Sequence, residues 1–356
     1  MIHSPNTVLA KYLNDVIDIV QPRLKLDKPK EILFYVGTNI NGAPHIGTYL
    51  VQSFAFVIAR RVRDKFNLPV KIVLGIHDNI SFDSKGDSDG NIFHRTYHHA
   101  LGKEEIKKLI DKYYSTYFKE LKTTINVPYS VEVYSDTQRT QNFREHFLKT
   151  LAHVDAMRWC TAPSSGLLQI RIPCPKCLYS ERDAIHTKLI GFDGYSATFE
   201  SRCVEHGSYE SVINVDNDIY IDLNTLYRNI VKEFSMTDSK DTLSVIIKGG
   251  DWVYSTEIID WALGTLGYTS IQVPMRIFLP QIVTTTGAKL SKSLIDEKLE
   301  SVKDVPEWMT DMSRFKESNP NYLKKLLQLT ELMMTDPRHV FRSYSYKEIE
   351  RLFSTI

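Results

Sequence analysis

Residues 36–48 read VGTNINGAPHIGT, and this stretch decides how the rest of the chain is interpreted. An apolar run over residues 32–36 precedes it, and a long apolar helix pattern begins at Tyr49. A strand, a glycine-containing turn and the start of a helix thus follow within about twenty residues, as in nucleotide sites at the edge of a parallel sheet. Gly37, Gly42 and Gly47 are spaced five apart and an imidazole precedes the helix, so the turn differs from the G-x-G-x-x-G pattern.

A second motif lies far downstream, where residues 289–293 read KLSKS after the stretch Thr286-Gly287-Ala288. The segment that leads into it, residues 276–279, is predicted to be the last strand of the sheet. Lysines on a mobile, glycine-containing loop can close over an anionic ligand. His45 stands at the start of a helix, where the positive end of the helix dipole favours phosphate. Together the two motifs favour a site that binds a nucleoside triphosphate.

The two motifs resemble the signatures of class I aminoacyl-tRNA synthetases. Pro44-His45-Ile46-Gly47 is similar to the HIGH signature, and KLSKS is similar to the second signature, usually KMSKS. Within the class, the closest likeness is to class I lysyl-tRNA synthetases, whose first motif reads like G-P-S-G-x-P-H-I-G-T. The stretches 203–207 and 248–251 also look similar, and the resemblance covers about residues 31–294. The KLSKS sequence and its TTTG lead depart from the subfamily, so the amino acid cannot be taken from it.

The resemblance implies a ligase that activates an amino acid with ATP and Mg²⁺ and transfers it to the 3′ end of a tRNA. In this reaction charge develops on the pyrophosphate oxygens, and preorganised donors stabilise it. The catalytic residues would be His45, Lys289 and Lys292. The residues expected to bind the nucleotide or line the adenylate pocket are Gly37, Thr38, Pro44, Gly47, Thr48, Gly249, Gly250, Asp251, Ser291 and Ser293.

Two acidic residues follow predicted strands and have two interpretations each. Asp78 comes after the apolar run 70–76, where ligands bind in open α/β sheets, and either holds the substrate ammonium or caps the turn. Asp251 comes after the strand predicted at residues 244–247 and two glycines that permit close backbone approach. It either contacts ribose hydroxyls or a substrate amine, or caps the following helix.

A cluster of cysteine and histidine residues lies between the two motifs. Cys174 and Cys177, then Cys203 and His206, form two pairs of the kind that supply four ligands to tetrahedral Zn²⁺. The glycine-containing segment 185–201 suits the hairpins of a zinc ribbon. We expect a structural zinc, since four protein donors leave no open position, with His186 as a spare ligand. The remaining cysteine, Cys160, is expected to be buried outside the cluster.

Strand and helix patterns alternate elsewhere, so we expect an α/β fold with a doubly wound parallel sheet, Rossmann-like and HUP-type. Helices are predicted over residues 7–20, 103–121, 138–157, 222–234 and 255–267, with a further strand at 131–134. The polar segment 81–102 contains three acidic residues and three histidines, and is interpreted as a mobile surface loop rather than a metal site. The predicted domains are the two catalytic halves 1–165 and 216–294, the zinc-ribbon-like insertion 166–215, and a helical tail 295–356 with at most three short helices.

Composition limits the classes of protein that need be considered. Hydrophobic residues make up 42% and charged residues 24% of the 356 residues, which is ordinary for a globular protein of about two domains. No run of eighteen apolar residues occurs and residues 1–11 lack the apolar core of a signal peptide, so we expect a cytoplasmic protein without membrane contact. The net charge of +1 gives no overall basic field for nucleic acid.

Three hypotheses about function remain open because the predicted tail is shorter than a full anticodon-binding domain. In the first, the protein charges a tRNA through its acceptor end. In the second, it passes the activated amino acid to a small-molecule amine or a carrier protein. In the third, it is a non-catalytic RNA-binding or regulatory relative, although the presence of His45 and both lysines favours intact chemistry.

Overall fold

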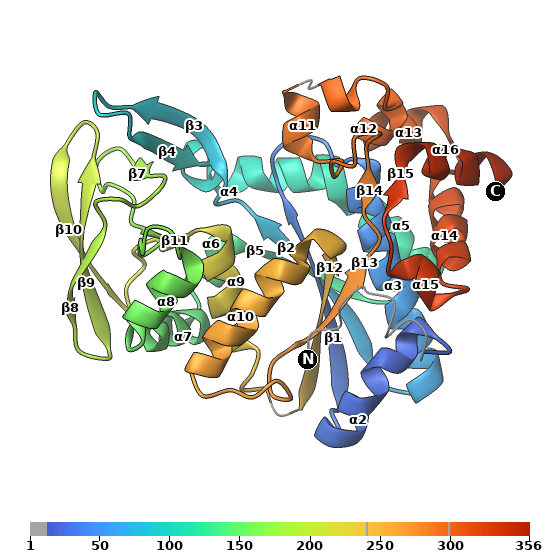
Figure 1. The fold of residues 1–356 in the computed structure, drawn as a ribbon, viewed down its shortest axis with the longest axis horizontal. Coiled ribbons are helices and arrows are strands. Elements are labelled where there is room, and N and C mark those ends of the chain that lie inside the picture. Colours follow the sequence, from blue (N-terminus) through green and yellow to red (C-terminus); the bar gives the residue numbers. More distant parts are fainter. Residues whose placement is uncertain (1–12, 240, 298–299) are drawn as a thin grey trace.

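A five-stranded sheet forms the centre of the computed structural model, which describes residues 13–239, 241–297 and 300–356. The strands lie in the order β13-β12-β1-β2-β5, and each neighbouring pair is parallel (Figure 1). Their bounds are Glu31–Asn39 for β1, Val70–His77 for β2, Tyr129–Val133 for β5, Thr242–Gly249 for β12 and Met275–Leu279 for β13. By chain position this is the Rossmann-type order 3-2-1-4-5, which confirms the predicted α/β fold.

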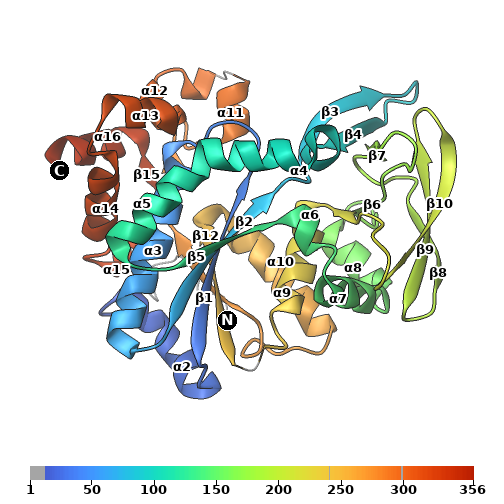
Figure 2. The same cartoon turned by 180° about the vertical axis from the view of Figure 1, so that it is seen from behind.

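Helices cover both faces of this sheet, as Figures 1 and 2 show from opposite sides. One face carries α3 (Ile46–Phe66) and α5 (Thr116–Ile125), and the other carries α9 (Thr225–Ser235) and α10 (Val253–Thr265). Strands β2 and β12 are accordingly buried at almost every position. A parallel strand covered on both faces needs apolar side chains in both directions, which is why these strands read as continuous apolar runs rather than as alternating patterns.

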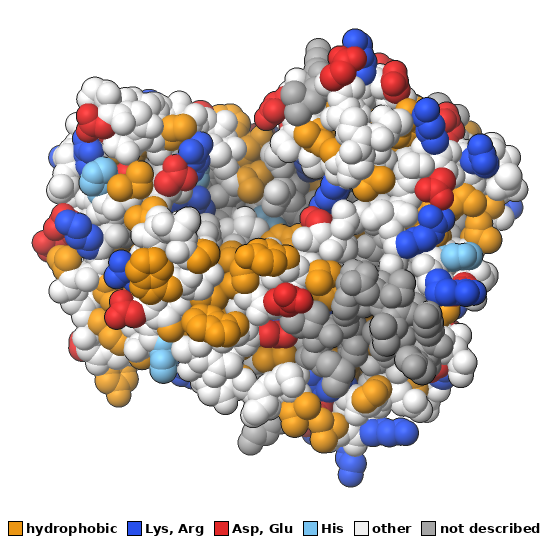
Figure 3. Space-filling view, in the orientation of Figure 1, with side chains coloured by type: hydrophobic (Ala, Val, Ile, Leu, Met, Phe, Trp, Pro, Cys, Tyr) orange, Lys and Arg blue, Asp and Glu red, His pale blue; other side chains and the backbone are white. Residues whose placement is uncertain are grey.

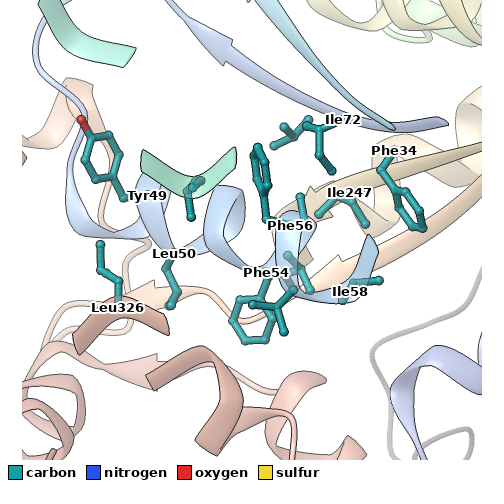
Figure 4. Packing of buried hydrophobic residues seen from close by; sticks show 14 of the residues in the cluster. Phe34, Tyr49, Leu50, Phe54, Phe56, Ile58, Ile72, Ile247 and Leu326 are labelled. Atoms are coloured by element: carbon teal, nitrogen blue, oxygen red, sulfur yellow. The ribbon is translucent and has the colours of Figure 1, made fainter. Parts of the chain in front are cut away.

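Helix α3 is the central helix of the larger hydrophobic cluster. It packs on β1 and β2 on one side and on α14 (Tyr322–Met333) on the other. In Figure 4, Phe56 of α3 points toward Ile72 of the sheet, whereas Leu50 points toward Leu326 of α14. Burying each such side chain contributes about 1.5–3 kcal/mol, so the contacts of α3 fix the position of its first turn.

The prediction of a mobile loop over residues 81–102 is wrong. The segment forms an antiparallel hairpin, β3 (Ser81–Gly86) and β4 (Ile92–Thr96), and then begins helix α4 (Tyr97–Ile110). The carboxylate of Asp87 accepts hydrogen bonds from the backbone N–H groups of Asp89 and Asn91, each at 2.9 Å. Acidic side chains that suggested a solvated loop therefore shape the tight turn of the hairpin.

The predicted inserted module is present as antiparallel sheet. Strands β8 (Lys188–Phe192), β9 (Ser196–Cys203) and β10 (Gly207–Asn214) form a three-stranded sheet in the order β10-β9-β8. The short strand β7 (Ser180–Glu181) pairs with β4, and β6 (Ile170–Arg171) pairs with β11 (Asp222–Leu223). The module thus joins the β3–β4 hairpin at one side of the molecule (Figure 1).

Several helices differ in extent from their predictions. The helix predicted over residues 103–121 is part of a longer run that passes from α4 through a π-helical turn, Asp111–Ser115, into α5. The helix predicted over 138–157 is divided into α7 (Gln141–Leu151) and α8 (Val154–Thr161), after the short α6 (Tyr134–Thr137). The helix predicted from residue 222 begins at Thr225, because the Asn224 side chain accepts a hydrogen bond from the N–H of Tyr227 at 2.8 Å.

The C-terminal segment holds more helix than predicted. In place of at most three short helices, the described residues after 300 form five α-helices: α12 (Glu307–Thr310), α13 (Met312–Ser318), α14, α15 (Pro337–Val340) and α16 (Tyr346–Thr355). Strand β15 (Tyr344–Ser345) pairs with β14 (Ile282–Val283), just before the KLSKS motif. The backbone N–H of Met312 donates to the carbonyl of Pro44 at 3.0 Å. This segment therefore packs on the core around the parallel sheet and supports the loop that carries His45.

The N-terminal helix predicted over residues 7–20 lies partly outside the described residues, which include its second half. There, a 3-10 helix spans Val16–Val20 and continues into α2 (Gln21–Asp27). No helix in the described parts of the chain is long and apolar enough to cross a membrane.

Candidate active site and metal centre

A cavity of about 260 Å³ lies at the carboxyl ends of β1 and β12. These two strands are neighbours at the point where the strand order reverses, which is where open α/β sheets bind ligands. Its walls come from the end of β1, the first turn of α3, the end of β12, one face of α9 and the segment 280–290. Figure 3 shows this face of the molecule hollowed between the parts that Figure 1 labels β4 and α11.

His45 caps the N-terminus of α3 and is buried. Its Nδ1 accepts a hydrogen bond from the backbone N–H of Gly47 at 3.1 Å, so in the neutral imidazole the proton sits on Nε2. Burial, together with the nearby charges of Lys289 and Lys292, lowers the pKa of His45 to about 3. The side chain is therefore a neutral imidazole at a helix N-terminus. Among the described residues its Nε2–H has no hydrogen-bond partner, so it could donate to a ligand.

The two lysines of the KLSKS motif approach the same region from the opposite wall. Lys289 Nζ lies 2.5 Å from Asp251 Oδ2, in an ion pair that is partly exposed. Lys292 Nζ donates to the backbone carbonyl oxygens of Asn41 at 2.6 Å and Asn39 at 3.0 Å. Burial lowers the pKa of Lys292 to about 8. Lys289 thus connects the downstream motif to Asp251, just after β12, and Lys292 connects it to the first motif.

At two positions of the site only glycine leaves room for an imidazole ring that lies close to the backbone. A Cβ at Gly37 would lie 2.9 Å from Cε1 of His77, which packs over β1 from the end of β2. A Cβ at Gly47 would lie 3.0 Å from Cε1 of His45. Gly42 is different, because its φ of 66° places it in the left-handed region that glycine adopts without strain.

The predicted site residues divide into those that line the cavity and those that support it. The cavity is lined by Gly37, Thr38, His45, Gly47, Thr48, Gly249, Asp251 and Lys289. Four predicted residues are outside this lining, namely Pro44, Gly250, Ser291 and Ser293, as is Lys292. Ser291 caps the short helix α11 (Lys292–Asp296), and its hydroxyl lies 3.2 Å from that of Ser293. The two serines therefore order the loop, and their nucleotide contacts stay a prediction.

Asp78 also lies outside the residues that line the cavity. Its side chain is fully buried, and Oδ1 accepts a hydrogen bond from the backbone N–H of Ser135 at 3.1 Å. His98 Nδ1 lies 3.6 Å from its Oδ2, and burial raises the pKa of Asp78 to about 6. This position favours the interpretation of Asp78 as a structural residue that joins β2 to the start of α6.

Sequence reasoning missed the wall that α9 contributes. Arg228, Asn229 and Lys232 line the cavity together with Tyr35 and His77. The available signal was the charge pattern of the helix, because Arg228 and Lys232 are four residues apart and so share one helix face. That pattern alone does not distinguish a solvated face from a ligand-binding face.

Three cysteines and one histidine converge in the inserted module, as predicted. The ligand atoms of Cys174, Cys177, Cys203 and His206 all lie within 4.8 Å of one another. Cys177 Sγ lies 3.4 Å from Cys203 Sγ, and His206 Nδ1 lies 3.5 Å from Cys203 Sγ. These separations are close to the edge of a tetrahedron with bonds of about 2.3 Å, so the residues fit Zn²⁺. The cluster could bind a zinc ion with no open coordination position.

Two further residues near the cluster have other roles. His186, the spare ligand, is 2.7 Å from Glu181 through its Nδ1 and does not join the four converging side chains. Cys160 lies outside the cluster as expected, but it is only partly buried, and its thiol donates to the carbonyl of Ile258 at 3.5 Å. The cluster is instead supported by the hairpin, since Lys85 of β3 forms an ion pair with Glu205.

Comparison with known proteins finds no family model and no curated protein that matches the sequence. Solved structures do match. A Mycobacterium tuberculosis methionyl-tRNA synthetase in complex with methionyl-adenylate is 12% identical with a TM-score of 0.46, covering 92% of this chain and 68% of that one. An Encephalitozoon cuniculi tryptophanyl-tRNA synthetase bound to tryptophan is 12% identical with a TM-score of 0.35, covering 96% and 83%. An Elizabethkingia anophelis glutamate-tRNA synthetase is 12% identical with a TM-score of 0.34, covering 75% and 54%.

These three structures are aminoacyl-tRNA synthetases, and the chain is similar to them at 12% identity and with TM-scores below 0.5. The lysyl subfamily, to which the sequence motifs seemed closest, has no support from these comparisons.

Proposed function

We propose that this chain activates an amino acid with ATP and transfers it to the 3′ end of a tRNA. In the first step, the substrate carboxylate attacks the α-phosphorus of ATP. A carboxyl oxygen–phosphorus bond forms, the bond to the bridging oxygen of pyrophosphate breaks, and pyrophosphate leaves with that electron pair. The observation that carries the proposal is the convergence of His45, Lys289 and Asp251 on one cavity at the switch point of the sheet.

The residues suit a reaction in which charge moves onto pyrophosphate. His45 is held neutral with Nε2–H as a donor, and the N-terminus of α3 adds its positive dipole. Lys289 and Lys292 supply two ammonium groups that now rest on Asp251 and on backbone carbonyls. A triphosphate would compete for these ammonium groups, and its transition state would bind them more strongly than its ground state.

The rest of the cavity suits the remaining parts of an adenylate. Gly47 and Gly249 let the His45 ring and the Asp251 carboxylate lie close against the backbone. In this proposal Asp251 accepts hydrogen bonds from ribose hydroxyls once Lys289 moves to phosphate. Mg²⁺ would enter with ATP and take phosphate oxygens among its ligands, as it commonly does in phosphoryl-transfer sites. Zn²⁺ in the Cys₃His cluster would hold the inserted module in shape.

The acceptor of the activated amino acid is proposed from the resemblance of the two motifs to synthetase signatures. A small-molecule amine or a carrier protein is the alternative acceptor, because both reactions begin with the same adenylate. A non-catalytic RNA-binding role is disfavoured, since it would not require a neutral imidazole and a lysine of the second motif at one cavity.

The test is isotopic exchange between pyrophosphate and ATP, measured with each amino acid in turn. We expect exchange that depends on one amino acid or a small group of related ones. Absence of exchange with every amino acid, in protein that still binds ATP, would contradict the proposal. Adding tRNA and isolating acid-precipitable aminoacyl-RNA then separates tRNA charging from transfer to a small amine or carrier.

A further inference from the structure

The part of the cavity away from the two motifs is lined by cations. Arg228 and Lys232 lie four residues apart on α9, and both line the cavity with Lys248 of β12. Lys232 Nζ would be 3.5 Å from a Cβ on Gly75, which is paired with Gly37 in the sheet. Lys232 is therefore over the central strands, whereas His45 and Lys289 lie beyond the strand ends.

Most other charges at this cavity already have partners. Lys248 Nζ is 2.7 Å from Glu233 Oε1, a buried carboxylate that also binds Arg276. Asp251 is the one carboxylate among the described residues that line the cavity, and it is paired with Lys289. These pairs leave the charges on α9 as the ones that are not neutralised within the cavity.

The two cations of α9 lack a carboxylate of their own inside the cavity. Arg228 Nη1 donates to the amide oxygen of Asn79, which carries no charge. Lys232 has an aromatic neighbour, the ring of Tyr35, with Nζ 5.1 Å from the centroid. In the described part of the chain no hydrogen bond or ion pair is made by the Lys232 ammonium. Burial lowers the pKa of Lys232 to about 8, while the charges of Glu132, which is exposed on β5, and of Glu233 oppose that shift.

Holding a buried Arg228 and a half-buried Lys232 without a carboxylate in the cavity carries a free-energy cost that a bound anion would lower. The reacting carboxylate cannot serve both this wall and the phosphate, because it must lie at the α-phosphorus, near His45 and the KLSKS lysines. A second anionic group on the substrate would satisfy the α9 wall. His77, between the two regions, stays neutral because burial and the charges of Arg228 and Lys232 lower its pKa.

Resting on the proposed function, we propose that the amino acid activated here has an acidic side chain, whose carboxylate is bound by Lys232 with help from Arg228. A lysine substrate would bring a third positive charge next to Arg228 and Lys232, and like charges in a low-dielectric cavity repel strongly. The proposed substrate thus has the opposite charge to lysine, the amino acid of the subfamily that the motifs resemble.

The experiment compares aspartate and glutamate with their neutral isosteres, asparagine and glutamine, and with lysine. Each is tested in pyrophosphate exchange and, separately, in calorimetric binding to the full chain. We expect one acidic amino acid to be preferred over its amide. Lys232→Gln should raise the KM for that acid about 10- to 100-fold with little change in kcat, because a charged hydrogen bond made in ground and transition states is lost.

Two controls separate recognition from stability. Lys119→Gln, which removes the charge of an exposed lysine on α5, should leave the KM unchanged. Lys232→Arg, which keeps the charge, should retain the preference for the acid over its amide. Circular dichroism and thermal unfolding check that Lys232→Gln remains folded.

The outcomes distinguish this inference from the proposed function. Exchange that prefers a neutral or basic amino acid would overturn the inference and leave amino-acid activation standing. Binding of an acid that is lost in Lys232→Gln, without exchange, would support the inference and overturn the proposed function. Neither binding nor exchange with any acid would overturn the inference, as would an unchanged KM in Lys232→Gln.

Discussion

At the scale of single residues, the proposed reaction depends on His45 and the KLSKS lysines, which would act on the charge that develops in its transition state. We expect His45→Ala and Lys292→Ala each to lower the rate of activation about 10²- to 10³-fold, while affinity for the amino acid changes little. Pyrophosphate exchange measures the rate, and calorimetry measures the affinity. Near-normal exchange in both variants would show that neither side chain stabilises the reaction.

The pKa of Lys292 gives a prediction about pH. Its pKa is lowered to about 8, so the ammonium is charged below this pH and becomes neutral above it. The kcat/KM for ATP, which reports ionisations of the free enzyme, should therefore fall as the pH rises past about 8. Lys292→Arg keeps its charge and should move this decline to higher pH.

His45 should not contribute to this pH profile, because its pKa of about 3 keeps it neutral throughout the pH range of the assay. It should contribute no titration between about pH 5 and 8, in contrast to an ordinary histidine. A decline that stays at the same pH in Lys292→Arg would assign it to another group.

At the scale of structural elements, the Cys₃His cluster should hold the inserted module together. The purified chain, never exposed to chelator, should contain about one zinc by elemental analysis. Cys177→Ser removes one ligand and should lose the metal together with the fold of strands β8–β10. Cys160→Ser, outside the cluster, should keep both. Metal-free protein whose cysteines all react freely with a thiol reagent would contradict the assignment.

Leucines of α14 should contribute to the free energy of unfolding according to how deeply each is buried. Leu326 is fully buried beside α3, whereas Leu332 on the same helix is 40% exposed. Leu326→Ala should lower the free energy of unfolding by about 2–5 kcal/mol, and Leu332→Ala by far less. Urea denaturation measures both. Equal effects would mean that α14 is not anchored through its buried face.

Elements with a strong local pattern were predictable from the sequence, and those decided by distant contacts were not. Strands β2 and β12 contain short apolar runs and are buried at nearly every position, and the α3 N-terminus has a histidine two residues before Gly47, so both could be placed. The β3–β4 hairpin was missed because its acidic turn has the composition of a solvated loop. Its pairing with β7, nearly ninety residues away, is not visible in local sequence.

The same distinction applies to the candidate site. His45, Lys289 and the Cys₃His ligands were found because each belongs to a short motif. Arg228 and Lys232 were missed because only the sheet brings α9 to the cavity. Asp78 was placed correctly at the end of a strand, but its side chain turns toward Ser135, a direction that sequence does not determine.

At the scale of the whole molecule, the C-terminal helices are part of the core. Glu331 of α14 binds both Arg60 and Arg61 of α3, and Tyr322 contacts Glu120 of α5. With these faces used for packing and a net charge of +1, we propose, as part of the proposed charging reaction, that a tRNA is contacted chiefly through its acceptor end.

Charging should then be indifferent to the anticodon. A tRNA with an exchanged anticodon should be charged as well as the parent, whereas changes in the acceptor stem should reduce charging. Binding should weaken steeply with salt, since phosphate contacts dominate it. Strong discrimination by the anticodon alone would show that residues 300–356 have a role in RNA recognition beyond packing.

The central claim is that the cavity transfers AMP to a carboxylate, and the fate of labelled ATP tests it most directly. The chain is incubated with ATP labelled at the α-phosphate, with the amino acid that supports exchange, and with pyrophosphatase, and the products are separated by chromatography. We predict label in aminoacyl-adenylate and AMP, in amounts that depend on the amino acid and fall sharply in His45→Ala. Label that appears in ADP instead, or in AMP irrespective of the amino acid, would contradict the account.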